Sequence, residues 1–312
     1  MTRALVFPGQ GSQFVGMGKA LAEAHAPARE VLEEVDEALG QHLSRLMFDG
    51  PEDDLKLTEN AQPALMAASL AVVRVLAADG KAVSDIASHV AGHSLGEYSA
   101  LAAAGALGLA DTARLLRHRG QAMQRAVPVG EGAMAALLGL DIDAAADVAE
   151  EAAGDQVCTP ANDNAPGQVV VSGHKAAVER AIDIARDRGA KRGVLLPVSA
   201  PFHCPLMQPA AEEMAAALAA VTIAVPTVPV IANVTAGPVD DPDTIRELLV
   251  QQVTGLVRWR ESVAAMPGLD IDTVVEAGAG KVLTGLVKRI DRSLTTVNVD
   301  DPDQVDAFAA SV

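Results

Sequence analysis

The sequence has few of the features that mark extracellular or membrane proteins. Its 312 residues include only two cysteines, Cys158 and Cys204, which suggest neither a disulfide framework nor a zinc site. The N-terminus lacks a positively charged segment followed by a long apolar run, and no stretch of about 20 apolar residues is free of charge and glycine. We therefore expect a soluble cytoplasmic protein without a signal peptide, a membrane-spanning helix or a bound metal.

Basic and aromatic residues are also scarce. The formal net charge of −17 argues against binding to nucleic acid or to an anionic membrane, because both need a basic face. Two basic runs lie within 114–125 and 281–292. The simplest interpretation of each is a solvated helix face, although the docking of an acidic partner on such a patch is also compatible with the sequence. With only 2 % aromatics, the core must rest on Ala, Val and Leu, which suits helices packed on a sheet.

Short apolar segments alternate with helical patterns along most of the chain. The predicted strands are Arg3–Phe7, 86–92, 228–234, 273–276 and 295–299. The main predicted helices are 15–25, 27–40, 62–78, 95–104, 111–127, 205–220, 245–252 and 282–289. This alternation indicates an α/β protein with a mostly parallel sheet.

The middle of the chain follows another pattern. Strands at 132–140, 157–161, 169–172 and 192–198 and helices at 141–153 and 174–188 give the order β-α-β-β-α-β, and the turn-rich segment NDNAPGQ joins the middle strands. That order is ferredoxin-like. We therefore predict an α/β-hydrolase-like large catalytic subdomain of residues 1–129 and 198–312, with a ferredoxin-like small subdomain inserted at 130–197.

The strongest chemical signal is Gly92-His93-Ser94-Leu95-Gly96, which fits the pattern G-x-S-x-G. It follows a predicted strand and opens a predicted helix, which is the context of a nucleophile elbow. The tight turn needs glycine on both sides, and it exposes the serine at a helix N-terminus where backbone N–H groups can stabilise an oxyanion. Ser94 is therefore the candidate nucleophile, and the alternative is a small residue in a packed turn.

A catalytic serine needs a base, and His203 stands out among the seven histidines. It lies in the proline-bracketed turn SAPFHCP at 199–205, just after a predicted strand, whereas most of the others fall in predicted helices or at their starts. From this pattern alone, two interpretations of His203 stay open, as a catalytic base or as a structural residue of the turn. No acid is marked as a third member of a triad, and Asp241 and Glu276 are only candidates.

Five segments together make the sequence recognisable. They are PGQGSQ at 8–13, GHSLGEYSAL at 92–101, RG at 119–120, the APFH run ending at His203, and EAGAGKVLTGL at 276–286. As a set they resemble the malonyl-CoA:acyl carrier protein transacylase family of fatty acid synthesis. The resemblance runs from end to end in the same order and spacing, so it is far more specific than any one motif.

The resemblance implies roles for the residues that carry the reaction. Ser94 would be the nucleophile and His203 its base. The backbone N–H groups of Gln10 and Leu95 would form the oxyanion hole. Malonyl-CoA would be the substrate and acyl carrier protein the partner, with no bound cofactor and no metal, in a stand-alone enzyme that we expect to be a monomer.

Three further residues would shape the acyl pocket. Arg119 would pair with the free carboxylate of the malonyl group, since a planar guanidinium offers two parallel N–H bonds, and acetyl would be disfavoured by roughly 2–5 kcal/mol. Without the resemblance, Arg119 is no better a candidate than its neighbours on the same helix. Phe202 would narrow the pocket against an α-methyl branch.

Gln252 matches the family glutamine that orients the histidine and lines the pocket. The family uses a carbonyl of this region where hydrolases use an acid, which accounts for the unmarked third member. One departure is Leu256, which stands where the family often has proline.

Other functions remain open from the sequence. A serine hydrolase or thioesterase would use the same Ser94 and His203 but transfer the acyl group to water. A malonyltransferase of a polyketide pathway or of a malonate decarboxylase system would have nearly the same sequence. A non-catalytic carrier-binding protein is a further alternative, which the intact set of Ser94, His203 and Arg119 disfavours.

Overall fold

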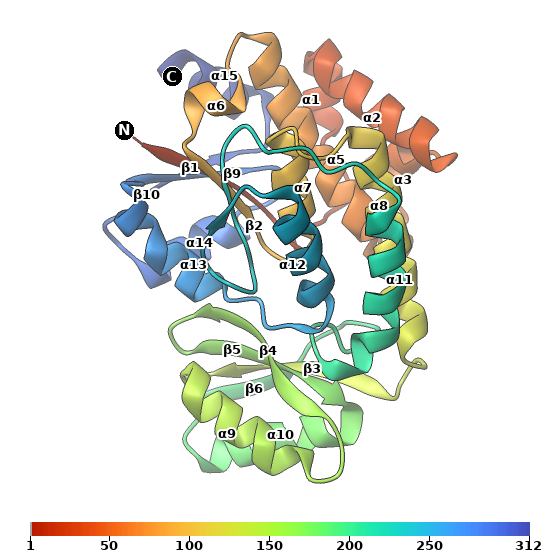
Figure 1. Cartoon of the computed structure of the whole chain (residues 1–312), viewed down its shortest axis with the longest axis vertical. Coiled ribbons are helices and arrows are strands. Elements are labelled where there is room, and N and C mark those ends of the chain that lie inside the picture. Colours follow the sequence, from red (N-terminus) through yellow and green to blue (C-terminus); the bar gives the residue numbers. More distant parts are fainter. Residues whose placement is uncertain (1) are drawn as a thin grey trace.

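Two β-sheets organise the protein in this computed structural model, which describes residues 2–312 (Figure 1). The first has the order β10-β9-β1-β2-β7-β8 and is parallel except for the β7–β8 pair. Its strands are β1 (Arg3–Phe7), β2 (His89–Gly92), β7 (Val230–Ile231), β8 (Pro238–Val239), β9 (Thr273–Ala277) and β10 (Thr295–Val299). The second is antiparallel, with the order β4-β5-β3-β6. Its strands are β3 (Gly132–Leu138), β4 (Cys158–Ala165), β5 (Gln168–His174) and β6 (Arg192–Leu195).

Helices cover both faces of the first sheet and one face of the second. Those before the second sheet are α1 (Lys19–Ala24), α2 (Ala26–Leu39), α3 (Leu43–Asp49), α4 (Glu52–Lys56), α5 (Thr58–Ala78), α6 (Val83–Ile86), α7 (Leu95–Ala103) and α8 (Leu109–Ala126). Those packed on it are α9 (Ile142–Ala153) and α10 (Lys175–Asp187). Those after it are the short 3-10 helix η1 (Pro205–Met207), α11 (Gln208–Ala219), α12 (Pro242–Thr254), α13 (Trp259–Ala265), the 3-10 helix η2 (Met266–Leu269), α14 (Val282–Ile290) and α15 (Pro302–Ser311).

The parallel sheet is buried on both faces, which explains the unbroken apolar run of β1. Leu5 and Phe7 pack into a large core that includes α2, α5 and α8, while Ala4 and Val6 pack against α13 and α14 on the opposite face. Helix α5 is long and apolar enough to cross a membrane by length and composition. However, 83 % of its most apolar window is buried inside the protein, so it is a core helix here.

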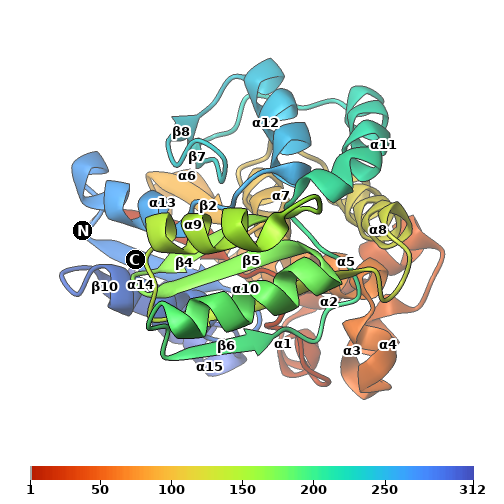
Figure 2. The ribbon, with the colours of Figure 1, turned by 90° about the horizontal axis from the view of Figure 1, so that it is seen from below.

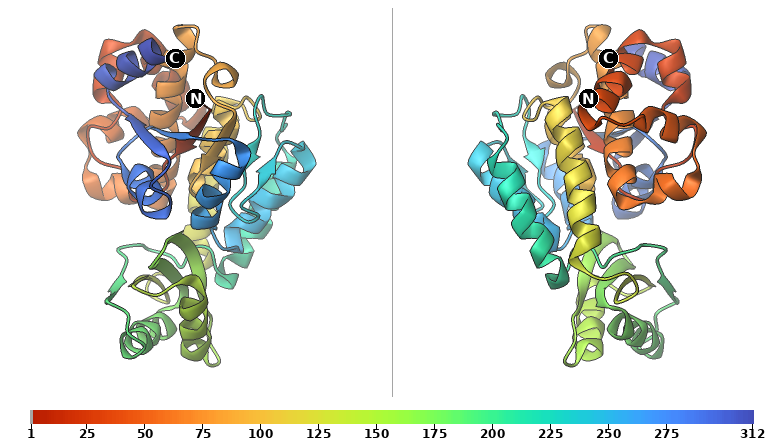
Figure 3. Two further views of the ribbon diagram at one scale, coloured as in Figure 1. Left: turned by 90° about the vertical axis from the view of Figure 1, so that its left-hand side faces the viewer. Right: turned by 90° about the vertical axis from the view of Figure 1, so that its right-hand side faces the viewer.

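The antiparallel sheet forms a separate lower layer, joined to the rest at a narrow waist (Figure 3). Helices α9 and α10 cover the face that points away from the parallel sheet (Figure 2). Along β3, Ala135 and Leu137 pack against these helices, whereas Met134 and Ala136 face the large core. This alternation leaves the face of the second sheet that α9 and α10 do not cover free to line the space between the two sheets.

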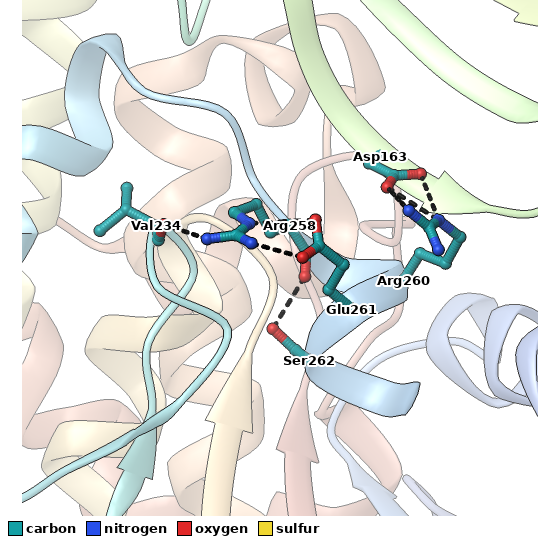
Figure 4. A network of polar contacts seen from close by, with 6 residues as sticks. All are labelled: Asp163, Val234, Arg258, Arg260, Glu261 and Ser262. Atoms are coloured by element: carbon teal, nitrogen blue, oxygen red, sulfur yellow. Dashed lines mark hydrogen bonds and ion pairs between the residues drawn. The ribbon is translucent and has the colours of Figure 1, made fainter. Parts of the chain in front are cut away.

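Backbone and side-chain contacts join strand β4 to the part of the molecule that contains the parallel sheet. Asn162 bridges Val257 in the parallel sense, and the Asp163 N–H donates to the Val257 carbonyl at 2.9 Å. The buried Asp163 carboxylate accepts from the guanidinium of Arg260 at 2.8 Å, beside a second pair formed by Arg258 and Glu261 (Figure 4). These contacts fix one side of the second sheet to α13.

The predicted fold class is confirmed, with its mostly parallel sheet and the ferredoxin-like strand order of the small sheet. Some local predictions are wrong. The strand predicted at 228–234 pairs only at Val230–Ile231, the one predicted at 192–198 ends at Leu195, and Ile86 belongs to α6 and not to a strand. Asn162, Asp163 and Asn164 of NDNAPGQ belong to β4 and not to a turn, because pairing with β5 and the contacts to Val257 and Arg260 hold them extended. Only Pro166 and Gly167 form the turn. The subdomain boundaries at 129/130 and 197/198 stay a prediction.

Candidate active site

The G-x-S-x-G segment forms a tight turn between β2 and α7. Ser94 has φ 53° and ψ −109°, a backbone conformation that is unfavourable for a residue with a Cβ atom. A Cβ on Gly92 would lie 1.9 Å from the carbonyl of Gly96, and one on Gly96 would lie 2.3 Å from the carbonyl oxygen of Phe7. The turn therefore requires both glycines and holds the serine at the N-terminus of α7.

Ser94 and His203 come together although 109 positions separate them in the sequence. The Oγ of Ser94 lies 2.7 Å from the Nε2 of His203. The histidine is 4 % exposed and also has a positive φ of 57°, in the turn between β6 and η1. A hydroxyl within hydrogen-bond reach of an imidazole nitrogen is the arrangement that nucleophilic catalysis by serine requires.

The other nitrogen of His203 faces a main-chain carbonyl and not an acid. Its Nδ1 lies 2.8 Å from the carbonyl oxygen of Gln252, near the end of α12, so an Nδ1–H tautomer leaves Nε2 free to accept a proton. Burial, and then the nearby charge of Arg119, lowers the pKa of His203 to about 3. Helix α12 ends at Thr254, so Leu256 lies beyond it and does not disturb this contact.

Neither of the two candidate acids contacts His203. Asp241 caps α12 by accepting from the N–H of Thr244 at 2.8 Å. Glu276 accepts from the backbone N–H groups of Leu283 and Thr284 at the start of α14. Both carboxylates therefore stabilise helix N-termini.

Arg119 lies in the same site, and the solvated-face interpretation is wrong for it. It is 1 % exposed on α8, with its guanidinium 5.6 Å from the centre of the Tyr98 ring. Among residues 2–312 its hydrogen-bond partners are all neutral: Gln62 Oε1 at 2.9 Å, Gln252 Oε1 at 2.9 Å and Ser94 Oγ at 3.1 Å. A buried cation that is hydrogen-bonded to no anion is costly, so this position is suited to receive an anionic ligand.

Gln10 and Leu95 lie beside the serine on the wall of the same cavity. Leu95 is the first residue of α7, where a helix leaves its N–H groups without intrahelical partners. Within residues 2–312, no hydrogen bond uses the backbone N–H of either residue, whereas the side chain of Gln10 donates to Thr58 Oγ1. Both N–H groups are thus available to an oxyanion.

A cavity of about 540 Å³ contains this group of residues between the two parts of the molecule. Ser94, Arg119, His203 and the 8 % exposed Phe202 line one side. The opposite lining residues are Met134, Asn162, Leu196, Pro197 and Val198, from β3, β4 and the segment after β6. The cavity is large enough for an acyl group together with the end of a thioester arm.

Three buried residues of the site were not predicted from the sequence. Gln62, on α5, bonds to Arg119, while Glu97 and Asn233 form hydrogen bonds beneath the serine. Glu97 carried a weak signal, because it lies inside the GHSLGEYSAL motif. Gln62 and Asn233 carried none that distinguishes them from ordinary core amides. No cluster of His, Cys, Asp and Glu within residues 2–312 is arranged to hold a metal ion.

The fold and this geometry define a class of protein. A serine on an elbow, a histidine at 2.7 Å and two free N–H groups, placed on an α/β sheet, are the parts of a serine-dependent acyl-transferring enzyme.

Comparison with known proteins narrows this class. The model of the acyl transferase domain family matches residues 4–302. Malonyl CoA-acyl carrier protein transacylases of Bacillus subtilis and Escherichia coli K12 are 45 % and 47 % identical over 304 residues, which cover 97 % of this chain and 95 % and 97 % of theirs. The crystal structure of the acyl-carrier-protein S-malonyltransferase of Bartonella henselae is 54 % identical with a TM-score of 0.98, covering 100 % of this chain and 99 % of that one.

A fourth relative was solved with a partner. A malonyl-transacylase in complex with a type II PKS acyl-carrier protein is 42 % identical, with a TM-score of 0.97 and full coverage of both chains. The chain therefore belongs to the acyl transferase domain family and, within it, to the malonyl-CoA:acyl carrier protein transacylases, as the sequence motifs predicted.

Proposed function

We propose that this enzyme transfers a malonyl group from malonyl-CoA to the phosphopantetheine thiol of an acyl carrier protein, through a malonyl ester of Ser94. The observation that carries the proposal is the placement of Arg119, a buried cation with neutral partners that touches the Oγ of the nucleophile. An acyl group on Ser94 therefore lies next to a guanidinium, which favours acyl groups that end in a carboxylate. The names of the relatives support the same substrate.

In the first half-reaction, His203 Nε2 takes the proton of Ser94 as Oγ attacks the thioester carbon. The negative charge on the former carbonyl oxygen is stabilised by the N–H groups of Gln10 and Leu95. The C–S bond then breaks, and the leaving sulfur of CoA takes the proton from His203. The carbonyl of Gln252 keeps the imidazole oriented and stabilises its charged form during the step.

In the second half-reaction, the carrier thiol gives its proton to His203, and its sulfur attacks the malonyl ester. The C–O bond to Ser94 breaks, and Oγ takes the proton back from the imidazole. Two similar thioesters exchange, so the enzyme mainly has to keep water from the ester. The wall formed by Met134, Leu196 and Val198 supports this exclusion, and Phe202 narrows the cavity against an α-methyl branch.

The proposal also includes the oligomeric state of the enzyme, its compartment, its small subdomain and its protein substrate. Ser94, His203, Arg119 and Gln252 all come from one chain, which supports a monomer as the working unit. Free, buried Cys158 and Cys204 thiols suit a reducing cytoplasm. We assign residues 130–197 to a small subdomain that forms one side of the cleft, and an acyl carrier protein to the cleft entrance as the second substrate. No bound cofactor is needed for the steps above.

Transfer to a carrier separates this function from hydrolysis. Malonyl-enzyme is freed of CoA and mixed with carrier protein that bears phosphopantetheine, with the same carrier lacking it, or with buffer alone. The proposal predicts rapid loss of the malonyl mass from the enzyme and its gain on the phosphopantetheine carrier only. Equal loss in all three samples would identify a hydrolase instead.

A further inference from the structure

A second layer of hydrogen bonds lies beneath the reacting groups, with Glu97 at its centre. Glu97 is on the first turn of α7 and is only 3 % exposed. Its Oε2 accepts two hydrogen bonds, from the backbone N–H of Asn233 at 3.0 Å and from the Nε2 of Gln252 at 2.8 Å. None of the roles proposed above uses this carboxylate.

Asn233 connects Glu97 to the nucleophile elbow. Its Oδ1 accepts from the N–H of Ser94 at 2.8 Å, and its Nδ2 donates to the carbonyl of Gly92 at 2.7 Å. The side chain therefore spans the elbow and bonds the backbone on both sides of His93. These two bonds support a serine whose φ of 53° is unfavourable in the absence of such support.

Gln252 connects Glu97 to both the base and the cation. Its Nε2 donates to Glu97 and to the Ser94 carbonyl, its Oε1 accepts from Arg119, and its main-chain carbonyl faces His203. A side-chain amide has one donor end and one acceptor end. The acceptors at Glu97 and at the Ser94 carbonyl therefore fix which end faces Arg119, because a rotated amide would place its NH₂ against the guanidinium N–H groups and its oxygen against these two acceptors. Glu97, at 2.8 Å, makes the shorter of the two contacts.

We propose that Glu97 is a positioning residue for the transfer, which fixes Asn233 behind Ser94 and the amide of Gln252 against Arg119. This inference rests on the proposed function, since it assigns Glu97 to malonyl selection. The property that matters is an acceptor oxygen and not a charge. Burial raises the pKa of Glu97 to about 7, and a proton on Oε1 would leave Oε2 able to accept both bonds.

The test compares removal of the acceptor with its retention. Glu97→Met keeps the length of the side chain but removes the acceptor, whereas Glu97→Gln keeps an oxygen that can accept both bonds. Glu276→Met is the matched control, because Glu276 is equally buried and accepts two backbone N–H groups outside the site. Acylation of Ser94 is followed by rapid quenching and intact mass, with malonyl-CoA and with acetyl-CoA, alongside the melting temperature.

The proposal predicts that Glu97→Met lowers kcat/KM for malonyl-CoA by about 100-fold, as expected when a reacting group is misplaced. The malonyl/acetyl ratio should fall with it, because Arg119 loses its fixed partner. Glu97→Gln should stay within about threefold of the wild type, and Glu276→Met should lose stability without a change in the ratio. An unchanged ratio in Glu97→Met, or a Glu97→Gln enzyme as slow as Glu97→Met, would overturn the proposal.

A second variant keeps the proposal testable if Glu97→Met does not fold. Asn233→Ala removes both bonds to the elbow and a long contact of 3.4 Å from Gln252 Nε2. It leaves the Glu97 and Ser94 acceptors of Gln252 and the backbone N–H that Glu97 binds. It should slow acylation by both donors to the same extent, with the malonyl/acetyl ratio preserved, and normal rates would overturn the role of this layer. Failure of the wild-type enzyme to form malonyl-Ser94 would instead contradict the proposed function.

Discussion

The Nη2 of Arg119 donates a hydrogen bond of 3.1 Å to the Oγ of Ser94. The two residues lie 25 positions apart, on α8 and at the start of α7, and the guanidinium is 1 % exposed. This contact puts a cation within reach of any acyl group that the serine carries. It links the choice of substrate to the atom that reacts.

Replacing Arg119 with Ala should invert the preference for the acyl donor. Malonyl transfer should be lost, and acetyl transfer should gain relative to it by roughly 30-fold or more, since breaking such a buried charge pair costs about 2–5 kcal/mol. The measurement is kcat/KM for both donors, with the exposed Arg114→Ala as the control on the same helix. An unchanged malonyl/acetyl ratio would refute the carboxylate-binding role.

Replacing His203 with Ala should slow acylation by about 10²–10⁴-fold, which is the contribution of a general base. The loss should be the same for malonyl-CoA and acetyl-CoA, because the proton leaves the same serine in both reactions. Burst-phase mass analysis measures the step directly, with His174→Ala as a control outside the cavity. Near-normal rates would place the base elsewhere.

The pH dependence of acylation follows from the lowered pKa of His203. A histidine with an ordinary pKa near 6.5 would lose its base form as the pH falls through that value, whereas His203, at about 3, stays neutral. With acetyl-CoA, kcat/KM should therefore be nearly flat from pH 8 to pH 5. In Arg119→Ala the acid limb should move to higher pH, because the charge of Arg119 helps to lower this pKa. A wild-type midpoint near 6.5 would contradict the account.

The glycines of the elbow give a prediction about stability. Gly96→Ala should destabilise the protein by about 1–3 kcal/mol or more and abolish acylation, because its Cβ would meet the carbonyl oxygen of Phe7 at 2.3 Å. Gly285→Ala is the matched control within α14, where a Cβ meets no atom within 4 Å, and it should stabilise the helix by about 0.5–1 kcal/mol. Chemical denaturation measures both. Equal effects of the two substitutions would argue against the close approach at the elbow.

A site residue can be predicted from the sequence when the residues that mark it are its neighbours in the chain. The elbow of Ser94 could be read directly, since its strand, glycines and helix are neighbours in the chain. Arg119 could not be separated from Arg114 and Arg117 by pattern, because its burial depends on α5 and α7, which pack against α8 only in the folded protein. Only the resemblance to a known family distinguished it.

The missed features are those that depend on tertiary contacts. Asn233 falls inside the strand predicted at 228–234 and looks like an ordinary residue there, whereas in the structure β7 pairs with β2 and brings it beside Gly92 and Ser94. The segment at 162–164 has the composition of a turn but is held as a strand by Val257 and Arg260, which lie about 95 positions later. The general alternation of strands and helices was readable because it is imposed by burial on both faces of the parallel sheet.

The central claim is that Ser94 carries the malonyl group, and its most direct test is the intact mass of the protein after brief mixing with malonyl-CoA. The account predicts a single malonyl adduct on the wild-type enzyme, a much smaller adduct with acetyl-CoA, and none on Ser94→Ala. Absence of the adduct on wild-type protein, or an equal adduct on Ser94→Ala, would contradict it.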